Sequence, residues 1–250
     1  MAMTAIDTLT PDAIAARLSG SPAERAAFVR EAADAGVAEA QAVYGQMLLD
    51  GIGVAVDPAA ALGWFTKAAA QHHVMALNMV GRCYDLGWGT AVDKTRAAEC
   101  YRIAGERGLD WAMYNYATLL ALGDGVTEDK PAALALLEKV AAMDSGLASA
   151  KAINFVGSFA EDGWACERDL TRAAACYASA AEGGDFRGCF NHARMLGAAG
   201  EIEMALAWLK QAGARGNAAF LVKAEAWLAT SDIPAFRMSG VAALREGAEC

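Results

Sequence analysis

Residue types that support metal binding are sparse in this sequence. The chain has three histidines, and two of them, His72 and His73, are adjacent. With Cys83 they form the nearest approach to a metal-ligating set, but no carboxylate pattern completes the ligands that a metal ion requires. A histidine pair in a turn between helices is more often solvated than ligating. The sequence therefore predicts no metal site.

Motifs for acid–base or phosphate chemistry are also missing. The sequence has neither a Gly-x-Ser-x-Gly nucleophile elbow nor a Gly-x₄-Gly-Lys-Ser/Thr phosphate loop. Four aspartates recur at equivalent positions, namely Asp57, Asp93, Asp129 and Asp169. This spacing puts one carboxylate in each repeating unit, whereas acid–base catalysis needs carboxylates that converge. We therefore expect no enzymatic activity and no cofactor.

Polar residues recur inside segments that favour helix. Asparagine is a mediocre helix-interior residue, because its side chain competes for backbone hydrogen bonds. Four asparagines nevertheless occupy such segments, each two or three positions before a recurring glycine or alanine, and two arginines follow that same small residue. With a tyrosine and a serine nearby, the candidate binding residues are Asn78, Arg82, Tyr114, Asn115, Asn154, Ser158, Asn191 and Arg194.

The elements that must position these residues follow from an internal repeat. Glycine pairs recur with a spacing of 36 residues, and a fourth copy follows after 40. The copies are Gly51/Gly53, Gly87/Gly89, Gly123/Gly125 and Gly163/Ala165. Aspartate, alanine and large apolar residues keep the same steps. Because several unrelated residue types share one period, chance is not a serious explanation.

Each repeat is predicted to fold as two helices. Residues 37–50 are rich in helix formers. Gly51 is placed to end that helix, since the left-handed conformation costs glycine nothing. Asp57 then caps the next helix, with Pro58 in its first turn. An apolar stripe at three- to four-residue spacing marks the buried face of this second helix. The sequence therefore predicts an all-α solenoid.

The repeated pattern has four parts: a Leu-Gly-type step, a Gly-x-Gly-Val turn, a following Asp, and a helix with Trp/Tyr-x-x-Ala-Ala. Residues 38–69 carry it, and later copies extend it over about residues 32–216. In these positions the chain resembles the Sel1-like repeat family, relatives of the tetratricopeptide repeat. The resemblance implies a right-handed α-α superhelix of about five helix-pair repeats with capping helices at both ends.

We predict a single solenoid domain over residues 1–250. Its predicted parts are N-terminal capping helices at 1–36, repeats at 37–72, 73–108, 109–147, 148–184 and 185–216, and C-terminal capping helices at 217–250. Ser21 and Glu24 form a capping box for the N-terminal part. Four extra residues within Asp144–Ala148 account for the step of 40 and amount to about one helical turn.

Composition narrows the class of partner and the compartment. The net charge is −9, which argues against a general nucleic-acid binder. The sequence lacks an apolar run of about 18 residues and a signal-peptide pattern at its start, so we expect no membrane partner. Its six cysteines match no zinc spacing. In the secreted, cysteine-rich subclass of the resembled family, cysteines pair eight residues apart, but Ala181 stands eight before Cys189. We expect a bacterial, cytoplasmic protein, monomeric or a weak homo-oligomer.

The family resemblance implies a non-catalytic scaffold or adaptor that binds a peptide or partner protein. In tetratricopeptide-like arrays the first helices line a concave groove, where asparagine can hold a peptide backbone as both donor and acceptor. The competing interpretation is that the asparagines are structural and bond a neighbouring helix. Two other functions stay open: a hydrolase or small-molecule-binding protein with its site in the groove, and a module that assembles end to end.

Overall fold

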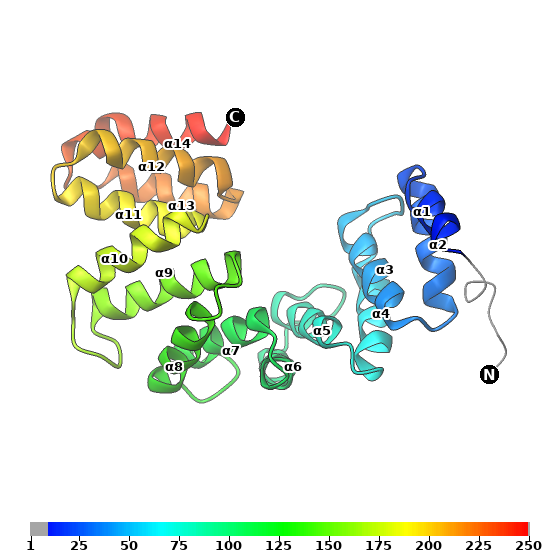
Figure 1. Cartoon of the computed structure of the whole chain (residues 1–250). Coiled ribbons are helices and arrows are strands. Elements are labelled where there is room, and N and C mark those ends of the chain that lie inside the picture. Colours follow the sequence, from blue (N-terminus) through cyan, green and yellow to red (C-terminus); the bar gives the residue numbers. More distant parts are fainter. Residues whose placement is uncertain (1–9, 250) are drawn as a thin grey trace. The chain divides into compact units, whose positions relative to one another are not determined.

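The computed structural model describes residues 10–249, and every regular element in that range is helical. Residues 1–9 and Cys250 lie outside the described residues, and with them the beginning of the predicted N-terminal capping segment and one of the six cysteines. Helices follow one another along the chain, and most pack against their neighbours in sequence (Figure 1). The predicted all-α solenoid of helix pairs is confirmed.

The chain divides into two compact units, residues 1–128 and 129–250, which are described separately. Unit 1 contains α1 (Pro11–Leu18), α2 (Pro22–Asp34), α3 (Ala38–Asp50), α4 (Pro58–Ala70), α5 (Val74–Leu86), α6 (Lys94–Glu106) and α7 (Asp110–Leu122). Unit 2 contains α8 (Lys130–Ala141), α9 (Leu147–Asp162), α10 (Leu170–Glu182), α11 (Phe186–Ala198), α12 (Ile202–Arg215), α13 (Ala218–Ala229), a π-helical turn (Phe236–Gly240) and α14 (Val241–Ala248). The first helices of the five repeats are α3, α5, α7, α9 and α11, and the helix after each is the second helix.

Aspartates and glycines set the helix ends at the predicted places. Asp57 and Asp93 accept hydrogen bonds of 2.9 and 3.0 Å from the third backbone amides of α4 and α6 in unit 1. Asp129 and Asp169 cap α8 and α10 in unit 2, both at 2.9 Å. The first helices of four repeats end at glycines with φ between +66° and +74°, namely Gly51, Gly87, Gly123 and Gly163. These local signals alone define both helices of a repeat.

The second glycine of each pair allows two backbones to meet. Gly89 lies against the backbone of Pro58, the first residue of α4, so that a methyl group there would collide with it. Gly125 lies in the same way against Lys94 at the start of α6. The period of 36 residues therefore reflects packing of each turn on the preceding second helix. In the fourth repeat Ala165 takes this place with φ of +57°, a left-handed conformation that is unfavourable for alanine.

A glycine inside the first helix makes room for an aromatic ring. A methyl group on Gly81 would lie 2.7 Å from the ring of Tyr101, which is itself buried. In the fifth repeat the same helix position is Ala193, and the second helix presents Leu209 instead of an aromatic residue. Both are fully buried in one cluster. The size of the second-helix side chain thus determines which small residue the first helix carries.

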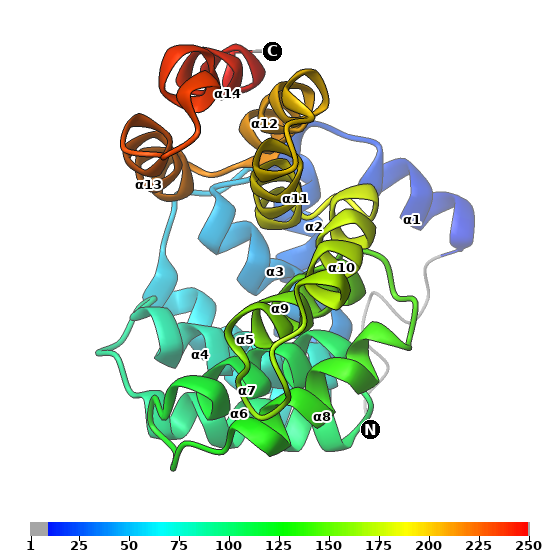
Figure 2. The same ribbon diagram turned by 90° about the vertical axis from the view of Figure 1, so that its left-hand side faces the viewer.

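The repeats depart from the regular pattern near the insertion and at the two ends. The extra residues lengthen α9 to 16 residues, compared with 13 in α3, α5 and α7. In unit 1 the predicted capping box is present, with the backbone amide of Ser21 donating to Glu24 Oε2 at 2.8 Å. In unit 2, α12 and α14 lie side by side (Figures 1 and 2). They touch through Gly213 and Gly247, where any side chain would meet the other helix's backbone.

Candidate binding site

The four predicted asparagines form two hydrogen-bonded pairs between successive first helices. In unit 1, Asn115 Nδ2 on α7 donates to Asn78 Oδ1 on α5 at 3.1 Å. In unit 2, Asn191 Nδ2 on α11 donates to Asn154 Oδ1 on α9 at 2.9 Å. The two acceptors are only 3% and 8% exposed, whereas both donors are half-buried.

Each pair satisfies a polar group that has lost contact with water. An amide oxygen left without a donor in such a place costs about 1–3 kcal/mol. Asn78 and Asn154 therefore connect helices and present little surface to a ligand. Asn115 and Asn191 keep part of their side chains exposed on the first helices. The predicted asparagine set is thus two interior acceptors and two partly accessible donors.

Arg194, on α11 of unit 2, is held by a carboxylate from the preceding first helix. Its Nη1 and Nη2 atoms donate to Glu161 Oε1 and Oε2 at 3.2 and 2.9 Å, and its Nε donates to Asn191 Oδ1 at 3.2 Å. The guanidinium also lies 5.7 Å from the Trp227 ring centroid. Burial alone would raise the pKa of Glu161, but the hydrogen bonds from Arg194 and Tyr177 hold it below its usual value. The charge of Arg194 is consequently balanced inside the protein.

Arg82, on α5 of unit 1, has the same register but different surroundings. Its guanidinium carbon lies 4.7 Å from the centroid of the Trp88 ring, and its Nη1 is 3.8 Å from Met79 Sδ. Across residues 10–249, no carboxylate lies within ion-pair distance of this guanidinium. A thioether sulfur is a weak acceptor. Arg82 therefore lies beside an aromatic ring without an ion-pair partner among the described residues.

The remaining predicted residues, Tyr114 and Ser158, are half-buried on first helices. The Tyr114 ring packs edge-on against Trp111 with centroids 6.5 Å apart. Ser158 Oγ lies 3.4 Å from the Asn154 carbonyl oxygen and 3.3 Å from the Tyr177 hydroxyl oxygen. The predicted residues of unit 1 lie on α5 and α7 and those of unit 2 on α9 and α11.

A cavity of about 470 Å³ opens beside Arg82 in unit 1. Its lining consists of Gln46, Leu49, Asp50, Pro58, Arg82 and Trp88. Gln46 Nε2 donates to Asp50 Oδ2 at 2.8 Å, so that the two polar residues of α3 support each other. Of this lining, only Arg82 was among the predicted binding residues. Two signals were available for the rest: Gln46 has the helix register of Arg82, and Trp88 lies in the Gly-Trp-Gly turn, where packing is the favoured interpretation.

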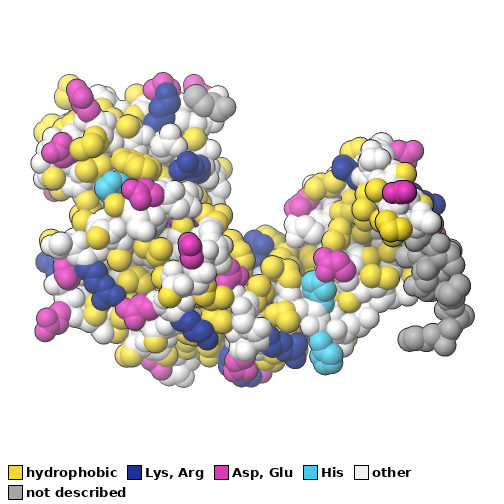
Figure 3. All heavy atoms as spheres, in the orientation of Figure 1, with side chains coloured by type: hydrophobic (Ala, Val, Ile, Leu, Met, Phe, Trp, Pro, Cys, Tyr) yellow, Lys and Arg dark blue, Asp and Glu magenta, His cyan; other side chains and the backbone are white. Residues whose placement is uncertain are grey.

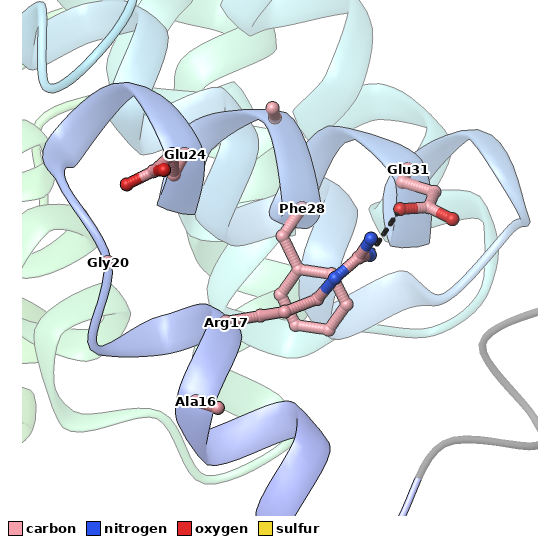
Figure 4. A pocket seen from close by; sticks show the side chains of 7 residues that line it. Ala16, Arg17, Gly20, Glu24, Phe28 and Glu31 are labelled. Atoms are coloured by element: carbon pink, nitrogen blue, oxygen red, sulfur yellow. Dashed lines mark hydrogen bonds and ion pairs between the residues drawn. The ribbon is translucent and has the colours of Figure 1, made fainter.

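A second cavity, of about 500 Å³, lies between α1 and α2, and its wall carries the charged residues Arg17, Glu24 and Glu31. Arg17 Nη1 is 2.6 Å from Glu31 Oε2 and stacks 5.0 Å from the Phe28 ring centroid (Figure 4). Glu24, also on this wall, belongs to the capping box with Ser21. The arginine of this cavity is thus already paired with a carboxylate, so the cavity offers an anionic ligand less than the one beside Arg82.

Metal and nucleophile chemistry find little support in the described part of the chain. No cluster of three or more histidine, cysteine, aspartate or glutamate residues suited to a metal ion occurs between residues 10 and 249. His73 caps α5 by accepting from the Ala76 amide at 3.0 Å, and its Nε2 lies 2.9 Å from Glu39 Oε2. Burial raises the pKa of the Cys83 thiol to about 11, which keeps that thiol protonated and weakly nucleophilic at neutral pH.

On the face shown in Figure 3, lysine and arginine side chains are dispersed among acidic ones instead of forming a basic patch. None of the helices between residues 10 and 249 combines the length and apolar character that crossing a bilayer requires.

Comparison with known proteins assigns the family. The model of the Sel1 repeat matches five times, at residues 38–73, 74–109, 112–145, 150–185 and 189–217, which is more than half of the chain. The chain belongs to the Sel1 repeat family. Among curated proteins, none matches this chain.

Solved structures share the fold at low sequence identity. A Sel1 repeat protein from Oxalobacter formigenes is 23% identical with a TM-score of 0.68, over 91% of this chain and 98% of that one. The protective antigen c5321 of uropathogenic Escherichia coli is 23% identical with a TM-score of 0.63, over 92% of this chain. The present chain spans 50% of that protein's length. Immunity protein Pa5087 of Pseudomonas aeruginosa is 16% identical, with a TM-score of 0.54 over 83% of this chain and 75% of that one.

Proposed function

We propose that this Sel1 repeat protein is a non-catalytic scaffold or adaptor that binds a peptide or partner protein on its first helices. Sel1 repeats generally mediate protein–protein interactions. The observation that carries the proposal for this chain is the cavity beside Arg82, because it combines a cation without an ion-pair partner, a half-buried tryptophan and apolar walls. Extended solenoid surfaces of this kind suit peptide ligands.

The proposed contact residues are Arg82, Tyr114 and Asn115 in unit 1, and Ser158, Asn191 and Arg194 in unit 2. Asn78 and Asn154 are proposed to act indirectly, because their side chains accept hydrogen bonds from Asn115 and Asn191 and so orient them. No nucleic acid, membrane or cofactor is part of the proposal.

The compartment that fits this proposal is the bacterial cytoplasm, with the protein as a monomer or weak homo-oligomer. The five described cysteines are free thiols that are buried or half-buried, as expected of a reducing environment. Immunity protein Pa5087 and the protective antigen c5321 share only the fold at their level of identity, so their titles do not select a partner for this chain.

The test is partner capture from native lysate with the wild-type chain and two matched variants. The first-helix variant combines Gln46→Ala with Arg82→Gln, both at the cavity. The control combines Thr66→Ala with Arg102→Gln on the second helices α4 and α6, and it removes the same charge and the same number of side chains. Circular dichroism and thermal melting establish that both variants remain folded.

We expect a partner that wild type and the control retain and the first-helix variant loses. Equal capture by both variants would move binding to another surface. Failure of the wild type to enrich any protein above bare beads would count against an adaptor role altogether.

A further inference from the structure

Five side chains share one register, directly after the small residue of each first helix, and four of them are satisfied within the chain. They are Gln46, Arg82, Thr118, Ser158 and Arg194. Gln46 donates to Asp50, Thr118 Oγ1 donates to the Tyr114 carbonyl at 3.0 Å, and Ser158 donates to the Asn154 carbonyl. Arg194 forms its paired hydrogen bonds with Glu161. Arg82 is the exception in this register.

Arg82 lines the cavity together with Trp88 and has no carboxylate partner among the described residues. A guanidinium that stacks on an indole uses its flat face, and its five N–H donors radiate in the plane. The guanidinium carbon of Arg82 lies over the Trp88 ring, 4.7 Å from its centroid. A bidentate carboxylate is the partner that an in-plane guanidinium edge prefers. In unit 2 such a carboxylate comes from Glu161, which lies on the first helix before that of Arg194, four residues after the glycine. In unit 1 the equivalent residue, on the first helix before that of Arg82, is Leu49.

The cavity beside Arg82 has the size and composition of a site for one acidic residue of a peptide. Its volume of about 470 Å³ falls within the roughly 300–1,000 Å³ of small-ligand pockets. Leu49 and Pro58 provide apolar walls for the stem of a side chain. Asp50, which accepts a hydrogen bond from Gln46 Nε2, places an acceptor on the same lining that suits the N–H groups of a peptide backbone.

We propose that this cavity is a carboxylate subsite, in which Arg82 binds an acidic side chain or the C-terminal carboxylate of a peptide. The proposal rests on the proposed function and specifies the ligand chemistry of the same first-helix surface. It assigns the subsite to unit 1, because the equivalent arginine of unit 2 already has Glu161. Trp88 orients the guanidinium and forms one side of the subsite.

The test uses pooled synthetic pentapeptides and the indole N–H signal of Trp88 in protein labelled with ¹⁵N at tryptophan. One pool has a central glutamate, acetylated and amidated ends, and random flanking residues, and its matched pool has glutamine in the centre. Another pool has a free C-terminal carboxylate, and its match is amidated. The pairs separate a side-chain source of the carboxylate from a terminal one. The Trp88 signal is identified by its loss in Trp88→Phe.

We expect at least one carboxylate pool to shift the Trp88 signal at millimolar concentration, while its amide match does not. Arg82→Gln should weaken that binding at least tenfold, as expected when a charge-assisted hydrogen bond is lost. Arg82→Lys should bind the peptides with an affinity between those of wild type and Arg82→Gln, because lysine keeps the charge and loses the planar donor edge. Arg96→Gln is the matched control. Its guanidinium also stacks on an aromatic ring, Tyr84, at 5.5 Å, but is paired with Asp93 at 3.3 Å.

Three results would overturn the carboxylate subsite: no shift with any pool, equal shifts with acid and amide pools, or full binding by Arg82→Gln. These results are separable from failure of the proposed function. If the first-helix variant loses a captured partner but no peptide pool is distinguished from its match, the adaptor role stands and the carboxylate subsite is wrong. Selective peptide binding without a captured partner leaves the subsite and removes the adaptor role.

Discussion

The Tyr177 hydroxyl on α10 donates a 2.6 Å hydrogen bond to Glu161 Oε2 on α9, the first helix of the same repeat. The second repeat has the same arrangement, with the Tyr101 hydroxyl 3.1 Å from Asp85 Oδ2. Both carboxylates stand four residues after the glycine of their first helix. Both tyrosines are buried, and each carboxylate accepts the hydroxyl hydrogen that the tyrosine brings into the core.

The first repeat shows the apolar counterpart of this pair. Its second helix carries Phe65 in the tyrosine position, and its first helix carries Leu49 in the carboxylate position. The two positions therefore change together along the chain, because a carboxylate facing a phenylalanine would have no donor there.

Replacing the tyrosine tests the strength of this link. Tyr177→Phe should lower the free energy of unfolding by about 1.5–3 kcal/mol, the range for a hydrogen bond to a charged group. Urea denaturation provides the measurement. Tyr44→Phe is the control, since Tyr44 is also buried and none of the described residues hydrogen-bonds its hydroxyl. Equal losses in the two variants would contradict a specific role for the hydrogen bond.

The same carboxylate should make stability depend on acid. The pKa of Glu161 is lower in the folded protein than its ordinary value of 4.5, so its stabilising contribution is present above pH 4.5. That contribution is lost as pH falls through the lowered pKa. Glu161→Gln should therefore be less stable than wild type at neutral pH, and the difference should shrink toward pH 3. Unfolding free energies measured from pH 7 to 3 decide this, and a constant difference would be the contrary result.

The turn glycines should be intolerant of any side chain. Gly89→Ala should destabilise unit 1 by more than 2 kcal/mol, because φ is +71° and the new methyl group meets the Pro58 backbone. Gly63→Ala is the matched change in the same unit. It lies inside α4 with open space around it, so it should raise stability by about 0.5–1 kcal/mol. Thermal melting compares the two, and similar effects would refute the close-approach explanation.

The fourth repeat offers the reverse experiment. Ala165→Gly should stabilise unit 2 by a few tenths to about 1 kcal/mol, since glycine relieves the cost of φ at +57°. Ala174→Gly, inside α10 of the same repeat, should instead destabilise by about 1 kcal/mol. Differential scanning calorimetry measures both variants. A loss of stability in Ala165→Gly would mean that flexibility of the unfolded chain outweighs the strain.

The asparagine pair of unit 1 should show energetic coupling. Single Asn78→Ala and Asn115→Ala variants and their double variant form a thermodynamic cycle, with a coupling energy of about 0.5–1.5 kcal/mol expected. Asn78→Ala should be the more harmful single change, because Asn78 is the buried member and its loss also leaves a cavity. Additive effects would show that the 3.1 Å contact contributes nothing to stability.

The positions of the helix ends could be predicted from the sequence because local chemistry sets them. Asp57 caps α4 through a hydrogen bond to a backbone amide three residues later, and Gly51 adopts a left-handed conformation that glycine reaches without strain. Because these signals repeat every 36 residues, the sequence predicted helix pairs. The residues of the repeated motif also predicted the Sel1 family, which the family match confirms.

The site was predicted less completely, because its chemistry depends on contacts between repeats. Register placed Arg82 and Arg194 in equivalent positions on their helices. It did not show that one is balanced and the other is not.

The sequence by itself determined the repeat, the helix ends and the residues that share a helix face, since all of these depend on neighbours within a few positions. Only the tertiary structure decided that Asn115 bonds Asn78, and that Glu161 balances Arg194 while Arg82 stacks on Trp88. The physical reason is that hydrogen bonds and ion pairs act over about 3 Å. The packing of successive helices, and not the spacing of residues along the chain, brings the Asn115–Asn78 and Arg194–Glu161 partners within that distance.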